Sequence, residues 1–140
     1  MKKRINTKRK RAVEIINSAS EHDIQSAFFD SLAVKHPKLP AFAIPNQGKR
    51  SYGAYRYFVK EGFRAGVPDV FIAKHNIMFA GLFIEFKTLN GKRTEKQIEW
   101  GEKLNKAGYI VTTCYDLNTA IQELEAYLLI DDDLKDIDYE

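Results

Sequence analysis

Three ionisable side chains stand in apolar surroundings near the two ends of the stretch between residues 66 and 87. They are Asp69, Glu85 and Lys87, and the last two lie within the segment LFIEFK. A charge inside an apolar strand costs free energy unless a partner or an ion compensates it. A divalent metal ion together with a phosphate group would compensate all three, which points to the hydrolysis of a phosphodiester.

The elements that must position these groups are two strands. The runs Val70–Ala73 and Phe79–Phe86 are rich in β-branched and aromatic residues, and the turn signal Lys74–Asn76 separates them. This pattern predicts an antiparallel hairpin. Asp69 enters the first run directly behind Pro68, whose ring restricts the backbone. The start of the first strand should therefore lie beside the end of the second.

Strand periodicity places the ionisable groups together. Because side chains alternate faces along a strand, Glu85 and Lys87 should point to one side, while Ile84 and Phe86 point into a core. Asp69 and Glu85 then converge, and two carboxylates repel each other unless a cation lies between them. Mg²⁺ prefers such oxygen ligands. Lys87 would orient or deprotonate a water molecule, or neutralise charge in the transition state.

The same residues carry a resemblance to a known family. Pro68-Asp69 followed by Glu85-Phe86-Lys87 resembles the PD-(D/E)xK nuclease core, and the surroundings resemble its VRR-NUC (virus-type replication-repair nuclease) branch over roughly residues 21–127. The supporting motifs are Ile44-Pro45-Asn46 with Gly48 and Arg50, Gly66-Val67-Pro68-Asp69, Phe83-Ile84-Glu85-Phe86-Lys87, Gln97 with Trp100, and the strand entry Gly108-Tyr109.

The resemblance implies a fold and a set of ligands. The fold would be α/β, a restriction-endonuclease-like PD-(D/E)xK core with a central mixed β-sheet flanked by α-helices. The cofactor would be Mg²⁺ or Mn²⁺, held by Asp69, Glu85 and the main-chain carbonyl of Phe86. The family also carries a glutamate on its first helix and a glutamine on a later one, both facing the active site. Glu21 and Gln97 are the matching residues here.

Each of these two residues has a second interpretation. Glu21 follows Ser20, an N-cap candidate, so it would also stabilise the start of a helix through the helix dipole. Gln97 stands three residues after Thr94, which is the spacing of a capping box. One side chain cannot easily serve both the cap and the active site, so the two interpretations of Gln97 stay open. His22 is interpreted as a surface residue.

Basic side chains near these motifs are candidates for contact with DNA phosphates. The segment 51–60 combines tyrosines with Arg56 at helical spacing. We interpret it as a core or interface helix, with stacking on unpaired bases as the alternative. Trp100 and Leu104, one turn apart, are predicted to lie in the core. The candidate DNA-binding residues are Lys49, Arg50, Arg64, Lys92, Arg93 and Lys96.

The predicted order of elements is α, β, α, β, β, α, β, α, which favours a mixed sheet flanked by helices. We expect three parts: a basic arm with a short helix over residues 1–19, the nuclease domain over 20–130, and an acidic tail over 131–140. Residues 2–11 hold seven Lys or Arg and no acid, while residues 131–140 hold six acids and one Lys. The basic arm suits contact with phosphates.

Composition limits the class of protein. Among 140 residues there is one cysteine, Cys114, which excludes an internal disulfide and is expected to be a buried thiol. No run reaches the length of a membrane span, and no apolar stretch follows the basic start. The expectation is a soluble cytoplasmic protein of a bacterium or of a phage-infected host cell.

The sequence therefore predicts a Mg²⁺-dependent endodeoxyribonuclease. By analogy with standalone relatives, it is expected to be a homodimer acting on branched or junction DNA, like a Holliday-junction resolvase. The alternatives are a monomeric nicking or flap nuclease and a non-catalytic DNA-binding accessory protein. A purely structural module, with Glu85 and Lys87 as a buried ion pair, is a further alternative.

Overall fold

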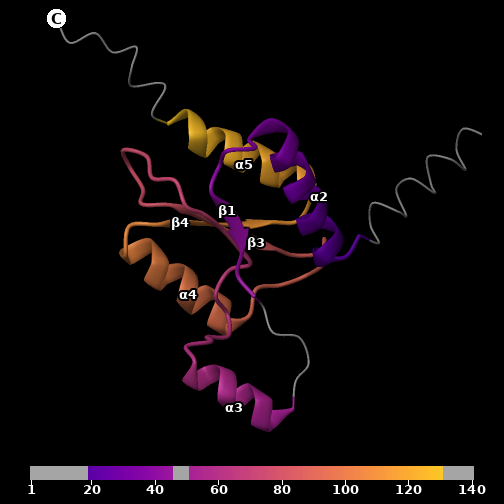
Figure 1. The fold of residues 1–140 in the computed structure, drawn as a ribbon, viewed down its shortest axis with the longest axis vertical. Helices are drawn as coiled ribbons and strands as arrows, with labels where there is room; N and C mark the ends of the chain where they lie inside the picture. Colours follow the sequence, from indigo (N-terminus) through magenta and orange to yellow (C-terminus); the bar gives the residue numbers. More distant parts are fainter. Residues whose placement is uncertain (1–18, 46–50, 131–140) are drawn as a thin grey trace, which may run out of the picture.

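A single mixed sheet organises the molecule. The computed structural model describes residues 19–45 and 51–130, and Figure 1 shows their arrangement. The strand order is β1-β2-β3-β4, in which β1–β2 and β2–β3 pair antiparallel and β3–β4 pair parallel. This confirms the predicted mixed sheet. The strands are β1 (Ala41–Ala43), β2 (Val70–Ile72), β3 (Leu82–Phe86) and β4 (Ile110–Cys114).

The described residues form four helices, in the predicted order along the chain. α2 and α5 pack together on one face, and α4 lies on the opposite side against β4 (Figure 1). α3 lies beyond α4, with no close backbone contact to any other helix or strand in the described part of the chain. The helices are α2 (Glu21–Lys35), α3 (Tyr52–Lys60), α4 (Glu95–Lys106) and α5 (Leu117–Leu129).

The predicted hairpin is present, although its second strand is shorter than expected. β2 pairs antiparallel with β3, with Phe71 opposite Phe83. The strand begins at Leu82 instead of Phe79, because the buried Asn76 side chain folds the preceding residues into a loop. Its Oδ1 accepts the N–H groups of Met78 and Phe79 at 2.9 and 2.8 Å. Those amides are therefore unavailable for pairing with a strand.

The main core lies between the sheet and the α2/α5 layer. Ile84 and Phe86 of β3 point into it, as predicted, and are 0% and 1% exposed. The ring of Phe86 lies 5.6 Å from that of Phe28 on α2. Cys114 of β4 is also fully buried, which confirms the expected buried thiol. Burial of these side chains fixes β3, and with it the residues at its end.

The opposite face of the sheet carries aromatic residues. The rings of Phe71 and Phe83 stack at 4.5 Å, and Tyr109 packs edge-on against both. Gly81 permits this stack, since a Cβ there would lie 2.6 Å from the Phe71 ring. β4 itself is only partly buried apart from Cys114.

The predicted burial of Trp100 and Leu104 was wrong, and so was the core interpretation of α3, whereas the interface interpretation of α3 stays a prediction. Trp100 and Leu104 are only partly buried, because α4 packs against the edge strand β4 alone and presents much of its surface outward. The aromatic helix α3 has no buried residue, so it is not part of the core; Tyr52 and Tyr57 are 78% and 64% exposed. Its periodicity is amphipathic, but in the described part of the chain its apolar side chains are at most partly covered.

Three regions with sequence predictions lie outside the described residues. They are the basic arm and short helix within 1–18, the loop 46–50 that holds Lys49 and Arg50, and the acidic tail 131–140. Their predicted roles stay predictions.

Candidate active site

The open end of the hairpin brings Asp69 opposite Glu85. Val70 pairs with Ile84, and the same register continued by one residue sets the two carboxylates side by side. Asp69 Oδ2 accepts the main-chain N–H of Phe86 at 2.8 Å. The Asp69 carbonyl accepts the N–H of Ile44 at 2.7 Å. The first bond fixes Asp69 beside the end of β3, as the hairpin predicted. The second fixes it to the segment that follows β1.

The turn before Asp69 is held by close packing. Gly66 has a φ of +90°, and a Cβ there would lie 2.6 Å from the backbone of Lys96 on α4. Only glycine combines this left-handed conformation with such a close approach. Pro68 follows and is fully buried. The segment therefore passes beneath α4 and delivers Asp69 rigidly to the site.

Glu85 is a buried carboxylate without full compensation. The residue is 1% exposed, and Oε1 has no hydrogen-bond partner among the described residues. Oε2 lies 3.6 Å from Nε of Arg93. Burial raises the pKa of Glu85; the neighbouring carboxylates Asp69 and Glu21 act in the same direction, while Lys87 and Arg93 oppose it. Such a carboxylate is suited to binding a cation.

Lys87 and Glu21 meet at the same site. The Lys87 residue is 9% exposed, and its Nζ lies 3.8 Å from Glu21 Oε1 at the start of α2. The ion pair that Glu85 makes is with Arg93 and not with Lys87. The structure therefore places Glu21 both in the first turn of its helix and beside Lys87, so its two interpretations are compatible. Ser20 caps this helix, as predicted.

Gln97 is occupied by the helix cap. Its Oε1 accepts the Thr94 N–H at 2.7 Å, and Thr94 Oγ1 accepts the Gln97 N–H at 3.2 Å. This reciprocal pair is the predicted capping box. The geometry favours the capping interpretation over the catalytic one.

The four candidate DNA-binding cations that the structure describes separate into three groups. Lys92 and Lys96 are exposed, just before α4 and in its first turn. Arg64 instead donates to the carbonyls of Val59 and Phe63 and so secures the end of α3. Arg93 turns inward to Glu85, a contact that the sequence did not reveal because it depends on how α4 packs.

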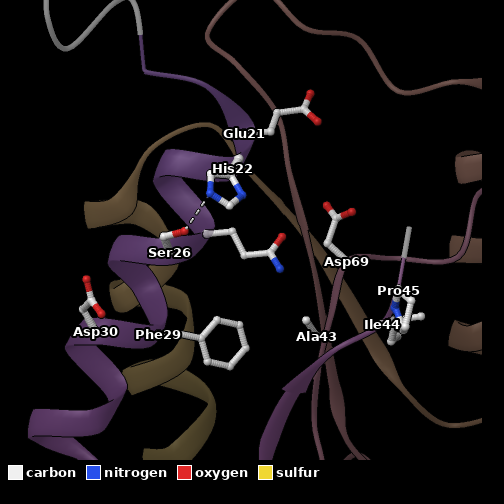
Figure 2. Close-up of a pocket in the computed structure, with 10 residues that line it drawn as sticks. Glu21, His22, Ser26, Phe29, Asp30, Ala43, Ile44, Pro45 and Asp69 are labelled. Carbon is white, nitrogen blue, oxygen red and sulfur yellow. Dashed lines mark hydrogen bonds between the residues drawn. The ribbon is translucent and has the colours of Figure 1, made fainter. Parts of the chain in front are cut away.

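A groove runs along α2, beginning at the carboxylates of Glu21 and Asp69 (Figure 2). It has a volume of about 820 Å³ and lies between α2 and the segment that follows β1. Glu21 and Asp69 border it from opposite sides, and the ring of Phe29 lies further along α2. Its charged lining residues are acidic and include Asp30, and among the described residues no lysine or arginine lines it. His22, predicted to be a surface residue, is exposed and borders it too.

The donor set fits a hard divalent cation. Asp69 and Glu85 supply facing carboxylates, and the uncompensated Glu85 Oε1 is an oxygen for which an ion would substitute the missing hydrogen bond. Within residues 19–45 and 51–130 no cluster of three or more His, Cys, Asp or Glu side chains suited to a metal is found. Two carboxylates completed by main-chain carbonyls and water are typical of Mg²⁺.

The described residues contain no helix long and apolar enough to cross a membrane.

Comparisons with known proteins agree with this geometry. The model of the VRR-NUC domain matches residues 19–116, a span that includes all the candidate residues described above. A solved structure described as a VRR_NUC domain protein superposes with a TM-score of 0.72 at 24% identity, covering 81% of this chain and 91% of that one. No curated protein matches. The chain therefore belongs to the VRR-NUC family, whose domain is a nuclease domain of the PD-(D/E)xK type.

Proposed function

We propose that this protein is a metal-dependent, structure-specific DNA endonuclease that works as a homodimer on branched DNA, in the manner of a Holliday-junction resolvase. The observation that carries the proposal is Glu85, a carboxylate that is 1% exposed, faces Asp69 and has an oxygen without a hydrogen-bond partner among the described residues. A purely structural strand gains nothing from this arrangement, since the buried charge is costly. A metal site explains it.

Asp69 and Glu85 would hold Mg²⁺ or Mn²⁺, with the Phe86 carbonyl as the third protein ligand that family resemblance suggests. When bound there, the ion would supply Lewis-acid chemistry: polarisation of a phosphoryl oxygen and a lower pKa for a water molecule in its coordination sphere. The hydrogen bond from the Phe86 N–H keeps Asp69 Oδ2 in place, so that the two carboxylates stay aligned for this task.

Lys87 acts on the attacking water. Its ammonium lies in a nearly buried position, where charge interactions are stronger than in bulk solvent. Glu21 fixes the ammonium from α2, at 3.8 Å. Lys87 therefore orients the water and neutralises negative charge as it develops on the phosphate. Glu21 positions Lys87 and is not required to touch the substrate.

The surface charge supports a route for DNA. Among the described residues, the groove along α2 is lined by acidic side chains and by no lysine or arginine, so this part of its lining disfavours a phosphate backbone. Lys92 and Lys96 are exposed, just before α4 and in its first turn. We therefore place the scissile strand along the start of α4, with phosphates contacting these lysines.

The homodimer is proposed by analogy with standalone members of the family. Two sites related by a two-fold axis would make paired cuts in a four-way junction. The proposed setting is the cytoplasm of a bacterium or of a phage-infected cell. Light scattering should give twice the mass of one chain; a monomer that cuts only flaps or nicks duplex DNA would contradict this part of the proposal.

A cleavage panel tests the activity. Labelled duplex, flap, replication-fork and four-way DNA are incubated with and without Mg²⁺. We expect Mg²⁺-dependent cleavage, preferentially of branched DNA, and its loss in Asp69→Ala, Glu85→Ala and Lys87→Ala. The matched control is His75→Ala, an exposed residue at the closed end of the hairpin. Full activity of any of the three site variants, with a preserved circular dichroism spectrum, would contradict the mechanism.

A further inference from the structure

Arg93 is a cation directed into the protein and not toward solvent. Its Nε lies 3.6 Å from Glu85 Oε2, and its Nη2 donates to the main-chain carbonyl of Gln97 at 3.3 Å. Nε is itself buried without a hydrogen-bond partner among the described residues. Its side chain is 32% exposed. A flexible surface arginine that only met DNA phosphates would have no need for this arrangement.

Gly101 provides the space for this guanidinium. It is the only residue of α4 that is buried. A Cβ at this position would lie 2.7 Å from Nη2 of Arg93, and no other side chain is so near. Glycine in the interior of a helix is unfavourable. Here it lets the guanidinium pass across the helix surface to reach Glu85.

The charges around Glu85 show what Arg93 contributes. Glu21, Asp69 and Glu85 supply three negative charges, and Lys87 and Arg93 supply two positive ones. The described cluster thus has one negative charge in excess, and without Arg93 it would have two. The positive charge of Arg93 thus offsets part of this negative charge, as the charge of a bound metal ion would.

We propose that Arg93 is a positioning residue which holds and neutralises the Glu85 carboxylate in the metal-free protein, and which thereby weakens the affinity of the site for a divalent cation. This inference rests on the proposed metal site. Gly101 is the residue that makes it sterically feasible. The site is thus kept folded and aligned before the metal binds, at the cost of weaker metal binding.

The first test compares Arg93→Gln with Lys92→Gln. Both remove one positive charge, but Lys92 is exposed and makes no ion pair with Glu85. In the metal-free protein, Arg93→Gln should lower the melting temperature by about 5 °C, since it leaves a buried charge uncompensated. In Mn²⁺ titration calorimetry, Arg93→Gln should lower the dissociation constant for Mn²⁺ about tenfold, and Lys92→Gln should change that constant much less. Unchanged values in Arg93→Gln would overturn the proposal.

The second test uses Gly101→Ala in two backgrounds. The added methyl group displaces the flexible end of Arg93 while the helix itself is favoured. Gly101→Ala alone should therefore tighten Mn²⁺ binding as Arg93→Gln does, and should add nothing in the Arg93→Gln background. An equal effect in both backgrounds would overturn the role of the guanidinium.

These readouts separate the inference from the proposed function. If neither the wild-type protein nor any variant binds Mn²⁺, the proposed metal-dependent activity is wrong, and the metal-free melting temperatures alone decide whether Arg93 holds Glu85. If Arg93→Gln loses cleavage at saturating Mn²⁺ with unchanged affinity and melting temperature, Arg93 contacts the substrate and the positioning role is overturned.

Discussion

Glu85 is the residue at which this sequence departs furthest from what a central strand requires. Its neighbours in β3 are apolar and buried, and a leucine or valine there would avoid the cost of a buried charge. The strand retains a carboxylate whose Oε1 has no hydrogen-bond partner among the described residues. The cost is concentrated in one residue, so a single substitution can separate function from stability.

We predict that Glu85→Gln lowers the rate of cleavage by at least about 100-fold while the metal-free protein is as stable as the wild type or more stable. The amide has the same shape but no charge to desolvate. Arg93 loses its partner, but its side chain is partly exposed and can turn to water. Single-turnover cleavage and urea unfolding in EDTA measure the two effects. A large loss of stability would show that the carboxylate is structural.

A second prediction concerns whether Glu21 contributes to cleavage only by positioning Lys87. Lys87→Met keeps the apolar stem and should lower the rate of cleavage about 100-fold. Glu21→Gln should have a smaller effect, because Glu21 acts through Lys87, from which it lies at 3.8 Å.

The double variant tests whether Glu21 acts only through Lys87. In the Lys87→Met background, Glu21→Gln should change the rate no further. Additive losses in the double variant would mean that Glu21 has a separate role, such as binding the metal through water.

The residue-level predictions succeeded where local rules decide the geometry. Asp69 and Glu85 could be brought together from strand alternation and a short turn alone. The orientation of Arg93 could not be predicted, because it depends on the space that Gly101 leaves in the interior of α4. Arg64 looked like a free cation, yet the carbonyls that it binds belong to the end of α3, whose position is tertiary.

At the scale of elements, the cap of α2 couples local stability to the site. Ser20 Oγ accepts the Asp23 N–H, Asp23 Oδ2 accepts the Ser20 N–H, and Glu21 is the first residue of the helix. The side chain that meets Lys87 is therefore fixed by the capping box. Fraying of this turn would release Glu21 from the site.

We predict that Ser20→Ala lowers the free energy of unfolding by about 1 kcal/mol. The hydrogen bonds with Ser20 hold the pKa of Asp23 below its ordinary value of 3.8. A carboxyl with a lowered folded-state pKa stabilises the protein above the unfolded pKa, and this contribution disappears as the pH falls through the folded value. Urea unfolding of Asp23→Asn should thus differ from the wild type at neutral pH and converge with it well below pH 3.8. A constant difference would exclude the charged cap.

The order of elements could be predicted because each has its own period and boundary residues. Gly108, with a φ of +97°, follows α4 as expected, and Asp116 Oδ1 accepts the Thr119 N–H at the start of α5. The extent of β3 could not be predicted, since Phe79 has strand propensity but its amide is bonded to Asn76. The core interpretation of α3 failed for a similar reason, because amphipathic periodicity does not specify what covers the helix; its interface interpretation stays a prediction.

Across the whole molecule, the site depends on one core. Phe28 of α2, Phe86 of β3 and Leu124 of α5 all lie in the same buried cluster. Cys114 belongs to that cluster and pairs with Phe86 in the parallel register of β3 and β4. An event that exposes Cys114 must therefore disturb the strands that carry Glu85 and Lys87. The single thiol is a reporter for the integrity of the site.

We predict that Cys114 in the native protein reacts with a disulfide reagent at least about 100-fold more slowly than in urea-unfolded protein. The residue is 0% exposed, and burial raises the pKa of its thiol to about 11, so little thiolate is present near neutral pH. Its reactivity should rise along the same urea transition as the circular dichroism signal. A control carrying Cys114→Ser and Tyr115→Cys, where the native side chain is 38% exposed, should react rapidly without urea.

The labelling rate of the same thiol also tests whether a metal ion binds to the native protein. A ligand that binds only the native state reduces the population of opened molecules. When opening and closing are fast relative to labelling, the labelling rate follows that population. Mn²⁺ at about 100 times its dissociation constant should thus slow the labelling of Cys114 by about a hundredfold in wild-type protein. The rate in Glu85→Gln should change little, because that variant lacks one of the two carboxylates that hold the ion. Equal slowing in both proteins would place the bound ion elsewhere and would leave the buried charge of Glu85 without its explanation.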